Sequence, residues 1–123
     1  MASHQSLGGV ERFHRLVQEM VRTYKKQLEE SVGHEIKPTI GIGSWLVRHC
    51  CWLIFRFHVP RELGKSGYSS AMGHNYDGRV VCFGEAVMAR KPQDVVQQRR
   101  TNKWENRWLR WLWIGKSDAS DKH

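Results

Sequence analysis

Residues 6–33 read SLGGVERFHRLVQEMVRTYKKQLEESVG, and the rest of the chain is organised around this stretch. Its apolar residues recur at intervals of three and four, which is typical of one face of an amphipathic helix. They are Val10, Phe13, Val17, Met20, Val21, Tyr24 and Leu28. We expect Gly8 and Gly9 to form a loose entry before this helix, and Gly33 to supply the left-handed residue that closes it.

The opposite side of this helix is polar. It carries Glu11, Arg15, Gln18 and Arg22, separated by four, three and four residues. A carboxylate followed by cations on one side could hold a metal ion and a phosphate backbone together. The same pattern is also that of an ordinary solvated helix face, and periodicity alone leaves both interpretations open.

A second helix is predicted over residues 44–59, SWLVRHCCWLIFRFHV. Ser44 can cap the start of this helix. The helix must end by Val59 because Pro60 follows. The segment is apolar on most sides, so it is expected to pack on more than one face. Two helices alone could not cover it, which favours a larger domain or an oligomer.

The second half of the chain contains loops and short strand patterns. Residues 61–77 are loop-like, with a possible helical turn near Tyr68–Met72. Two strands are expected at Val80–Phe83 and Ala86–Ala89, with Cys82 in a strand interior. Four of the six tryptophans fall between residues 104 and 113, and periodicity permits either a helix or a strand over residues 102–113.

Composition favours one small domain that binds a polyanion. The chain has 123 residues, a formal net charge of +8 and 40% hydrophobic residues. Residues 89–116 carry eight Lys or Arg against two acids, a net +6. Such a basic segment favours nucleic acid over a membrane surface.

Cysteine usage and hydropathy predict a protein of the cell interior. Three cysteines, two of them adjacent, do not form a disulfide framework and fit a reducing compartment. His49, Cys50 and Cys51 lack paired zinc-ligand spacing, so a core role is expected, and His14 is expected at the surface. No apolar run reaches the length of a membrane span, so we expect no membrane partner and a nuclear or cytoplasmic location.

Four segments in order resemble the late part of integrases encoded by LTR retrotransposons. They are GGVERFHRLVQEMVRT, WLVRHCCWLIFRFHV, GRVVCFGEAVMARK and KWENRWLRWLWIGKSDASDKH. The resemblance implies an α+β chain in which two long N-terminal helices end an incomplete ribonuclease-H-like core and a small antiparallel β module follows. The implied parts are residues 6–76 for the truncated core, 77–117 for the basic β module and 118–123 for a polar tail.

The resemblance implies that Glu11 is a catalytic carboxylate and metal ligand. Such cores hold two Mg²⁺ ions with an Asp, Asp, Glu triad, and two-metal catalysis needs the ions about 4 Å apart. Glu11, followed by Arg12, matches the third carboxylate, although the loop before it, around Leu7–Gly8, matches the usual asparagine–glycine pattern only approximately. The two aspartates would lie upstream, so Mg²⁺ is expected only in a complete core, and the chain is expected to be inactive alone.

The resemblance also implies a set of DNA contacts. Arg15 and Gln18 match positions that contact DNA in such integrases, and Arg22 continues their row. In the C-terminal region the expected nucleic-acid-binding residues are Arg99, Arg100, Lys103, Arg107 and Arg110, with Lys116 also among the cations interleaved with tryptophan. The tryptophans could equally form a core with these cations at its rim, which we favour for Trp113. Trp111 stands where relatives have a turn glycine, so a terminal hairpin and a helix both remain open.

Three functions therefore remain. The chain could be part of an integrase that needs its upstream core, with DNA and that core as partners and a homo-oligomer possible. It could be a non-catalytic nucleic-acid-binding remnant. It could also be a helical module whose apolar surface docks on another protein.

Overall fold

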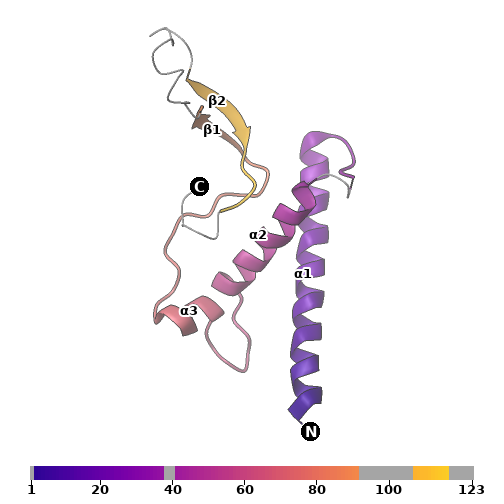
Figure 1. Ribbon diagram of the computed structural model, residues 1–123, viewed down its shortest axis with the longest axis vertical. Helices are drawn as coiled ribbons and strands as arrows, with labels where there is room; N and C mark the ends of the chain where they lie inside the picture. Colours follow the sequence, from indigo (N-terminus) through magenta and orange to yellow (C-terminus); the bar gives the residue numbers. More distant parts are fainter. Residues whose placement is uncertain (1, 38–40, 92–106, 117–123) are drawn as a thin grey trace.

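A computed structural model describes residues 2–37, 41–91 and 107–116, with only the backbone for residues 2–7. The elements follow the order α1 (Ala2–Val32), α2 (Ile42–Phe57), α3 (Gly67–Met72), β1 (Ala86–Arg90) and β2 (Trp108–Leu112). Helix α2 crosses α1 obliquely, α3 lies beyond the end of α2, and the β1–β2 hairpin extends away from the helices (Figure 1). The mixed α+β class expected from the sequence is confirmed.

Helix α1 confirms the first predicted helix but begins earlier than expected. It runs from Ala2 through Gly8 and Gly9, so the expectation that these glycines form a loose entry is wrong. Glycine inside a helix costs roughly 1 kcal/mol relative to alanine, and a long helix tolerates that penalty. The end is as predicted, because Gly33 has φ +78° and its N–H donates to the carbonyl of Glu29 at 2.9 Å.

The start of α2 also differs from the expectation. The helix begins at Ile42, and Gly41 occupies the cap position with helical φ and ψ and no side-chain cap. Ser44 therefore lies inside the first turn, and its expected capping role is wrong. The end is confirmed, since the helix stops at Phe57 and His58 is extended, ahead of Pro60.

The helical turn expected near Tyr68–Met72 is confirmed as α3. Ser66 precedes it, and its Oγ accepts a hydrogen bond from the backbone N–H of Ser69 at 3.1 Å. Gly73, with φ +81°, closes the helix. Side-chain capping at one end and a left-handed glycine at the other fix this short element.

The two strands form an antiparallel hairpin in which Val87 lies opposite Trp111 and Arg90 opposite Trp108. Residues 108–112 are therefore a strand. Trp111 needs no turn geometry because it lies within that strand, and no described non-glycine residue has a positive φ. Val80–Phe83 forms no strand, so that expectation is wrong, and so is the placement of Cys82 in a strand interior. Cys82 is exposed and accepts from the N–H of Glu85 at 3.0 Å in the turn that leads into β1.

The core lies between α1, α2 and the base of the hairpin. Its buried members are Leu28, Leu46, Cys50 and Phe83, surrounded by partly buried Met20, Val21, Tyr24, Ile36, Ile42, Trp45 and Ile114. The later part of the apolar face predicted for α1, from Met20 to Leu28, thus packs on α2, whereas Val10 and Phe13 near its start are exposed. None of the described helices combines the length and the hydropathy needed to cross a membrane.

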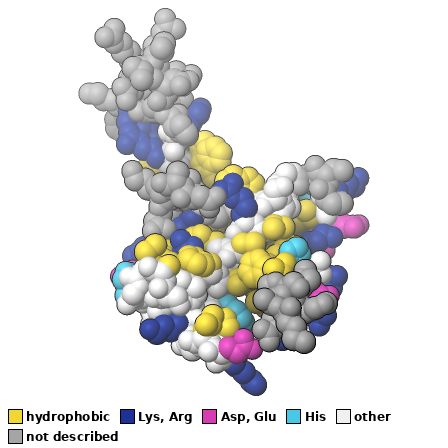
Figure 2. All heavy atoms as spheres, turned by 60° about the horizontal axis from the view of Figure 1, so that its bottom comes forward, with side chains coloured by type: hydrophobic (Ala, Val, Ile, Leu, Met, Phe, Trp, Pro, Cys, Tyr) yellow, Lys and Arg dark blue, Asp and Glu magenta, His cyan; other side chains and the backbone are white. Residues whose placement is uncertain are grey.

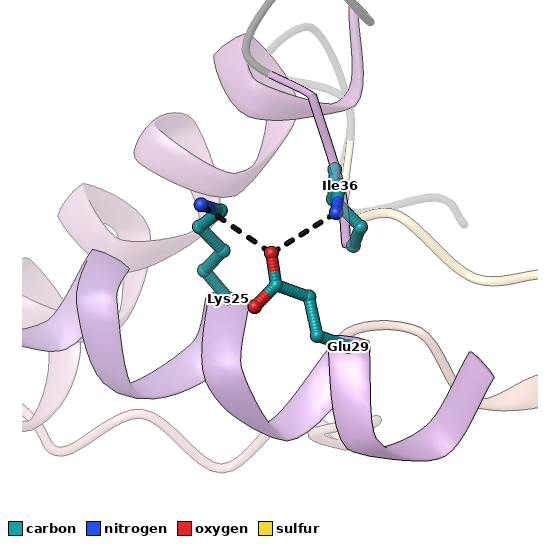
Figure 3. A network of polar contacts seen from close by, with 3 residues as sticks. All are labelled: Lys25, Glu29 and Ile36. Atoms are coloured by element: carbon teal, nitrogen blue, oxygen red, sulfur yellow. Dashed lines mark hydrogen bonds and ion pairs between the residues drawn. The ribbon is translucent and has the colours of Figure 1, made fainter. Parts of the chain in front are cut away.

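A carboxylate fixes the path of the chain after α1 (Figure 3). Oε1 of Glu29 accepts from the backbone N–H of Ile36 at 3.0 Å and lies 3.3 Å from Nζ of Lys25. The hydrogen bond from Ile36, and then Lys25, hold the pKa of Glu29 below its usual value. This contact brings Ile36 back onto the core.

Gly84 joins the turn to β1 under two constraints. Its φ is +82°, and a Cβ at this position would lie 2.5 Å from Cδ1 of Leu28, which is buried. We expect Gly84→Ala to lower the free energy of unfolding by about 1–3 kcal/mol, as measured by urea denaturation. Gly9→Ala is the matched control, because no atom lies within 4 Å of its Cβ position and alanine favours a helix. Equal stability of the two variants would contradict the tight fit.

Candidate nucleic-acid interface

The predicted polar row on α1 is present and solvent-exposed. Glu11, Arg15, Gln18 and Arg22 are all exposed along one side of the helix. Two other charges of α1 are already engaged: Arg12 lies 3.6 Å from Glu62, and Lys25 lies beside Glu29. The structure therefore brings four of the predicted site residues together on one surface.

An apolar groove of about 520 Å³ borders this row. Gln18 and Arg22 lie on its rim, next to His14, which is exposed as predicted. Its apolar lining comes from both long helices and consists of Phe13, Val17, Val21, Val47 and Cys51. Figure 2 shows hydrophobic side chains exposed near the middle of one face of the molecule, with Lys and Arg mostly around them. The polar row therefore lies beside a surface that the described residues leave uncovered.

Glu11 does not form a metal site with the other described residues. Among residues 8–37, 41–91 and 107–116 no three His, Cys, Asp or Glu side chains gather closely enough to hold a metal ion. Mg²⁺ requires several hard oxygen ligands in octahedral geometry, and a single carboxylate does not satisfy that requirement. The described residues alone do not fit a Mg²⁺ centre, so no catalytic step is derived from them.

The hairpin carries the second basic surface. Arg110 is exposed on β2, as predicted for a binding residue, and Arg90 on β1 is an exposed cation that sequence reasoning did not select. Arg107 is half-buried before β2, and its carbonyl accepts from the N–H of Lys91 at 2.9 Å. Arg99, Arg100 and Lys103 lie outside the described residues. Arg90 could have been found only from the strand register, which places it opposite Trp108.

Aromatic rings that include Trp52 and Tyr76 engage two cations, Arg56 and Lys116. The Arg56 guanidinium lies 4.2 Å from the ring centroid of Trp52 and 5.1 Å from that of Tyr76. Lys116 is 9% exposed, and its Nζ donates to the hydroxyl of Tyr76 at 2.8 Å. Cation–π contacts of this kind stabilise a fold. Lys116 is thus directed inward, whereas Arg15 and Arg22 of α1 and Arg90 and Arg110 of the hairpin are exposed to a polyanion.

His49 joins the helices to the base of the hairpin. It is 4% exposed, and its ring lies 5.5 Å from that of Phe83 and 5.3 Å from that of Trp113. Tyr24 approaches it edge-on from α1 at 5.8 Å. The expected core roles of His49, Cys50 and Trp113 are confirmed by their burial.

Comparisons with known protein families, with curated proteins and with solved structures find no match to the chain.

Burial lowers the pKa of His49 below its ordinary value of 6.5. Folding therefore favours the neutral ring, so its contribution to stability is present above pH 6.5 and is lost as the pH falls through the lowered pKa. We expect the thermal midpoint of wild-type protein to fall between pH 7 and pH 5, and that of His49→Leu to fall less. The control His14→Leu removes an exposed histidine and should keep the wild-type slope. A His49→Leu protein with the wild-type pH dependence would contradict this assignment.

The three cysteines should differ in reactivity. Burial, and then the neighbouring Cys51, raise the pKa of Cys50 to about 11, whereas Cys82 is exposed. Because the thiolate is the reactive form, we expect iodoacetamide to modify Cys82 readily and Cys50 only after unfolding. Peptide mass spectrometry with and without denaturant measures this difference. Modification of native Cys50 as fast as Cys82 would show that the α1–α2 core is open.

Proposed function

We propose that the chain is the nucleic-acid-binding part of a retroelement integrase, completed by a catalytic core that other residues supply. The resemblance of four ordered segments to such integrases motivates the proposal. The role would be DNA integration, and the partners would be DNA and the remainder of the core. The ribonuclease-H-like origin of the α1–α2 pair belongs to this proposal.

One observation carries the proposal: the exposed row on α1 borders an apolar groove. Arg15 and Arg22 are exposed cations, and Gln18 between them can donate and accept hydrogen bonds. Cations and amides arranged in this way bind phosphate oxygens and base edges. The adjacent groove is suited to cover by further protein, as a core sheet would provide. The charged row would then remain at the edge of the completed unit.

In this proposal Glu11 has a role only when the catalytic core is complete. It lies one turn before Arg15 on the same exposed side, so a completed core could use it beside bound DNA. Its role as a Mg²⁺ ligand requires two further carboxylates from outside the described residues. No chemical step is assigned to this chain alone.

The apolar groove specifically favours a second candidate function. Val47 of α2 and Phe13 of α1 are both exposed and line it, which also fits a helical module that docks on another protein. Such a module would bind its partner without binding DNA. DNA binding by the purified chain therefore distinguishes the two functions.

We expect the chain to bind duplex DNA with an affinity that falls steeply with salt, and Arg15→Ala/Arg22→Ala to weaken that binding at least tenfold. Each lost phosphate contact should reduce the slope of log K against log salt by about 0.9, so the double variant should lose up to about 2. Fluorescence anisotropy with a labelled duplex measures both quantities.

The matched control is Lys65→Ala/Lys37→Ala, which removes the same charge from exposed positions outside the row. An equal loss of affinity in the control would show that the effect comes from net charge and not from the row on α1. Unchanged binding in Arg15→Ala/Arg22→Ala would exclude the α1 row from the interface, and no DNA binding at low salt would leave the docking module as the function.

A further inference from the structure

The register of the hairpin separates its side chains into two chemically different faces. Residues directly opposite each other in an antiparallel pair lie on the same face. One face therefore carries Ala86 with Leu112, Met88 with Arg110, and Arg90 with Trp108. The other carries Val87 with Trp111 and Ala89 with Leu109. All the charges of the two strands lie on the first face.

On β1 the residues of the two faces also differ in solvent exposure. On β1 the residues of the charged face, Ala86, Met88 and Arg90, are exposed, while Val87 and Ala89 of the opposite face are half-buried. Trp108 is 54% exposed, which is unusual for the largest hydrophobic side chain. On β2 both faces are exposed, with Trp111 at 46% and Leu109 at 39%, so the charged face is distinguished by its two arginines and by its greater exposure on β1.

Two cations flank Trp108 on this face. Arg90 lies directly across the strand pair, where Cβ atoms are about 5 Å apart. Arg110 lies two residues along the same strand, about 7 Å away at a rise of about 3.4 Å per residue. Arg90 and Arg110 are not opposite each other, so the pairing adds no directly opposed like charges. The exposed Trp108 side chain thus lies near two guanidinium groups, one across the strand pair and one along its own strand.

We infer that the face formed by Arg90, Trp108 and Arg110 stacks an unpaired base of a single-stranded nucleic acid. The inference rests on the proposed function and specifies which form of nucleic acid this surface selects. An exposed indole between two guanidinium groups matches the chemistry of single-strand binding, in which a base stacks on an aromatic ring and cations hold the adjoining phosphates. Every base has a flat face, so the surface selects unpaired bases and not a sequence.

Duplex DNA does not offer the same contact. Its bases are already stacked and paired, and bringing one out costs a few kcal/mol. A duplex can still contact Arg90 and Arg110 through its phosphates. The Trp108 contribution should therefore appear only with single strands, which separates it from charge attraction.

The experiment compares Trp108→Leu with Trp111→Leu, because these tryptophans lie on opposite faces of one strand. The full chain is titrated against labelled oligothymidylate and oligouridylate of about 15 nucleotides and against a duplex of equal length. Trp108→Leu should weaken single-strand binding about tenfold, since base–aromatic stacking is worth about 1–3 kcal/mol, and should leave duplex binding unchanged. Trp111→Leu should leave both unchanged.

A further variant guards against simple loss of the hairpin. Trp108→Phe keeps an aromatic ring at the same register position and should retain most of the single-strand affinity. Equal affinity for the thymidylate and uridylate strands would assign the site to either nucleic acid, and a difference would assign it to the tighter one. In both cases the stacking role stands.

Two results overturn the inference in different ways. The inference fails if Trp108→Leu weakens duplex and single-strand binding equally. It also fails if Trp111→Leu weakens single-strand binding as much as Trp108→Leu does. In either case the charged face does not stack bases, and the proposed function stands. If neither nucleic acid binds the wild-type chain at low salt, the proposed function fails together with this inference.

Discussion

The contact between α1 and α2 around Cys50 is the interaction on which the rest of the structure depends. Leu28 of α1 meets Leu46 and Cys50 of α2 there, and Phe83 closes the same core from the turn before β1. A core of this size is small for a chain of 123 residues. Both the connection after α1 and the base of the hairpin pack on it, so opening it would release both of these segments.

The sequence predicted most of the helical part because periodicity reports which side of a helix is buried. The spacing from Val10 to Leu28 identified α1, and Gly33 marked its end, as the structure confirms. The residues at which the two long helices begin were less predictable. Gly8, Gly9 and Gly43 all lie inside helices, because the modest preference of glycine against a helix is outweighed by the packing of the residues that follow.

The hairpin and the cation contacts depended on partners that a single segment does not reveal. Residues 102–113 fit a helix or a strand, and for residues 108–112 only the pairing of Trp111 with Val87 shows that they form a strand. Val80–Phe83 resembles a strand because it is rich in β-branched and aromatic residues, but it forms no described strand pair, and Phe83 is instead buried in the core. Lys116 was expected either to contact phosphates or to lie at the rim of a tryptophan core, whereas a tyrosine forty positions away accepts its hydrogen bond. Neither arrangement leaves a local pattern.

Among the described residues, the contacts between the hairpin and the helices lie at one end of the hairpin. Phe83 and Trp113 pack beside His49, and Lys116 bonds to Tyr76, whereas the backbone of neither described strand lies against a helix. An isolated pair of strands is marginally stable in water, so its free energy of local opening is set by few contacts. Amide protons of β1 and β2 should therefore exchange with solvent much faster than those of α1 and α2. A ligand that orders the strands can therefore do so without disturbing the packing of α1 on α2. The strands can change conformation while the two long helices stay in place.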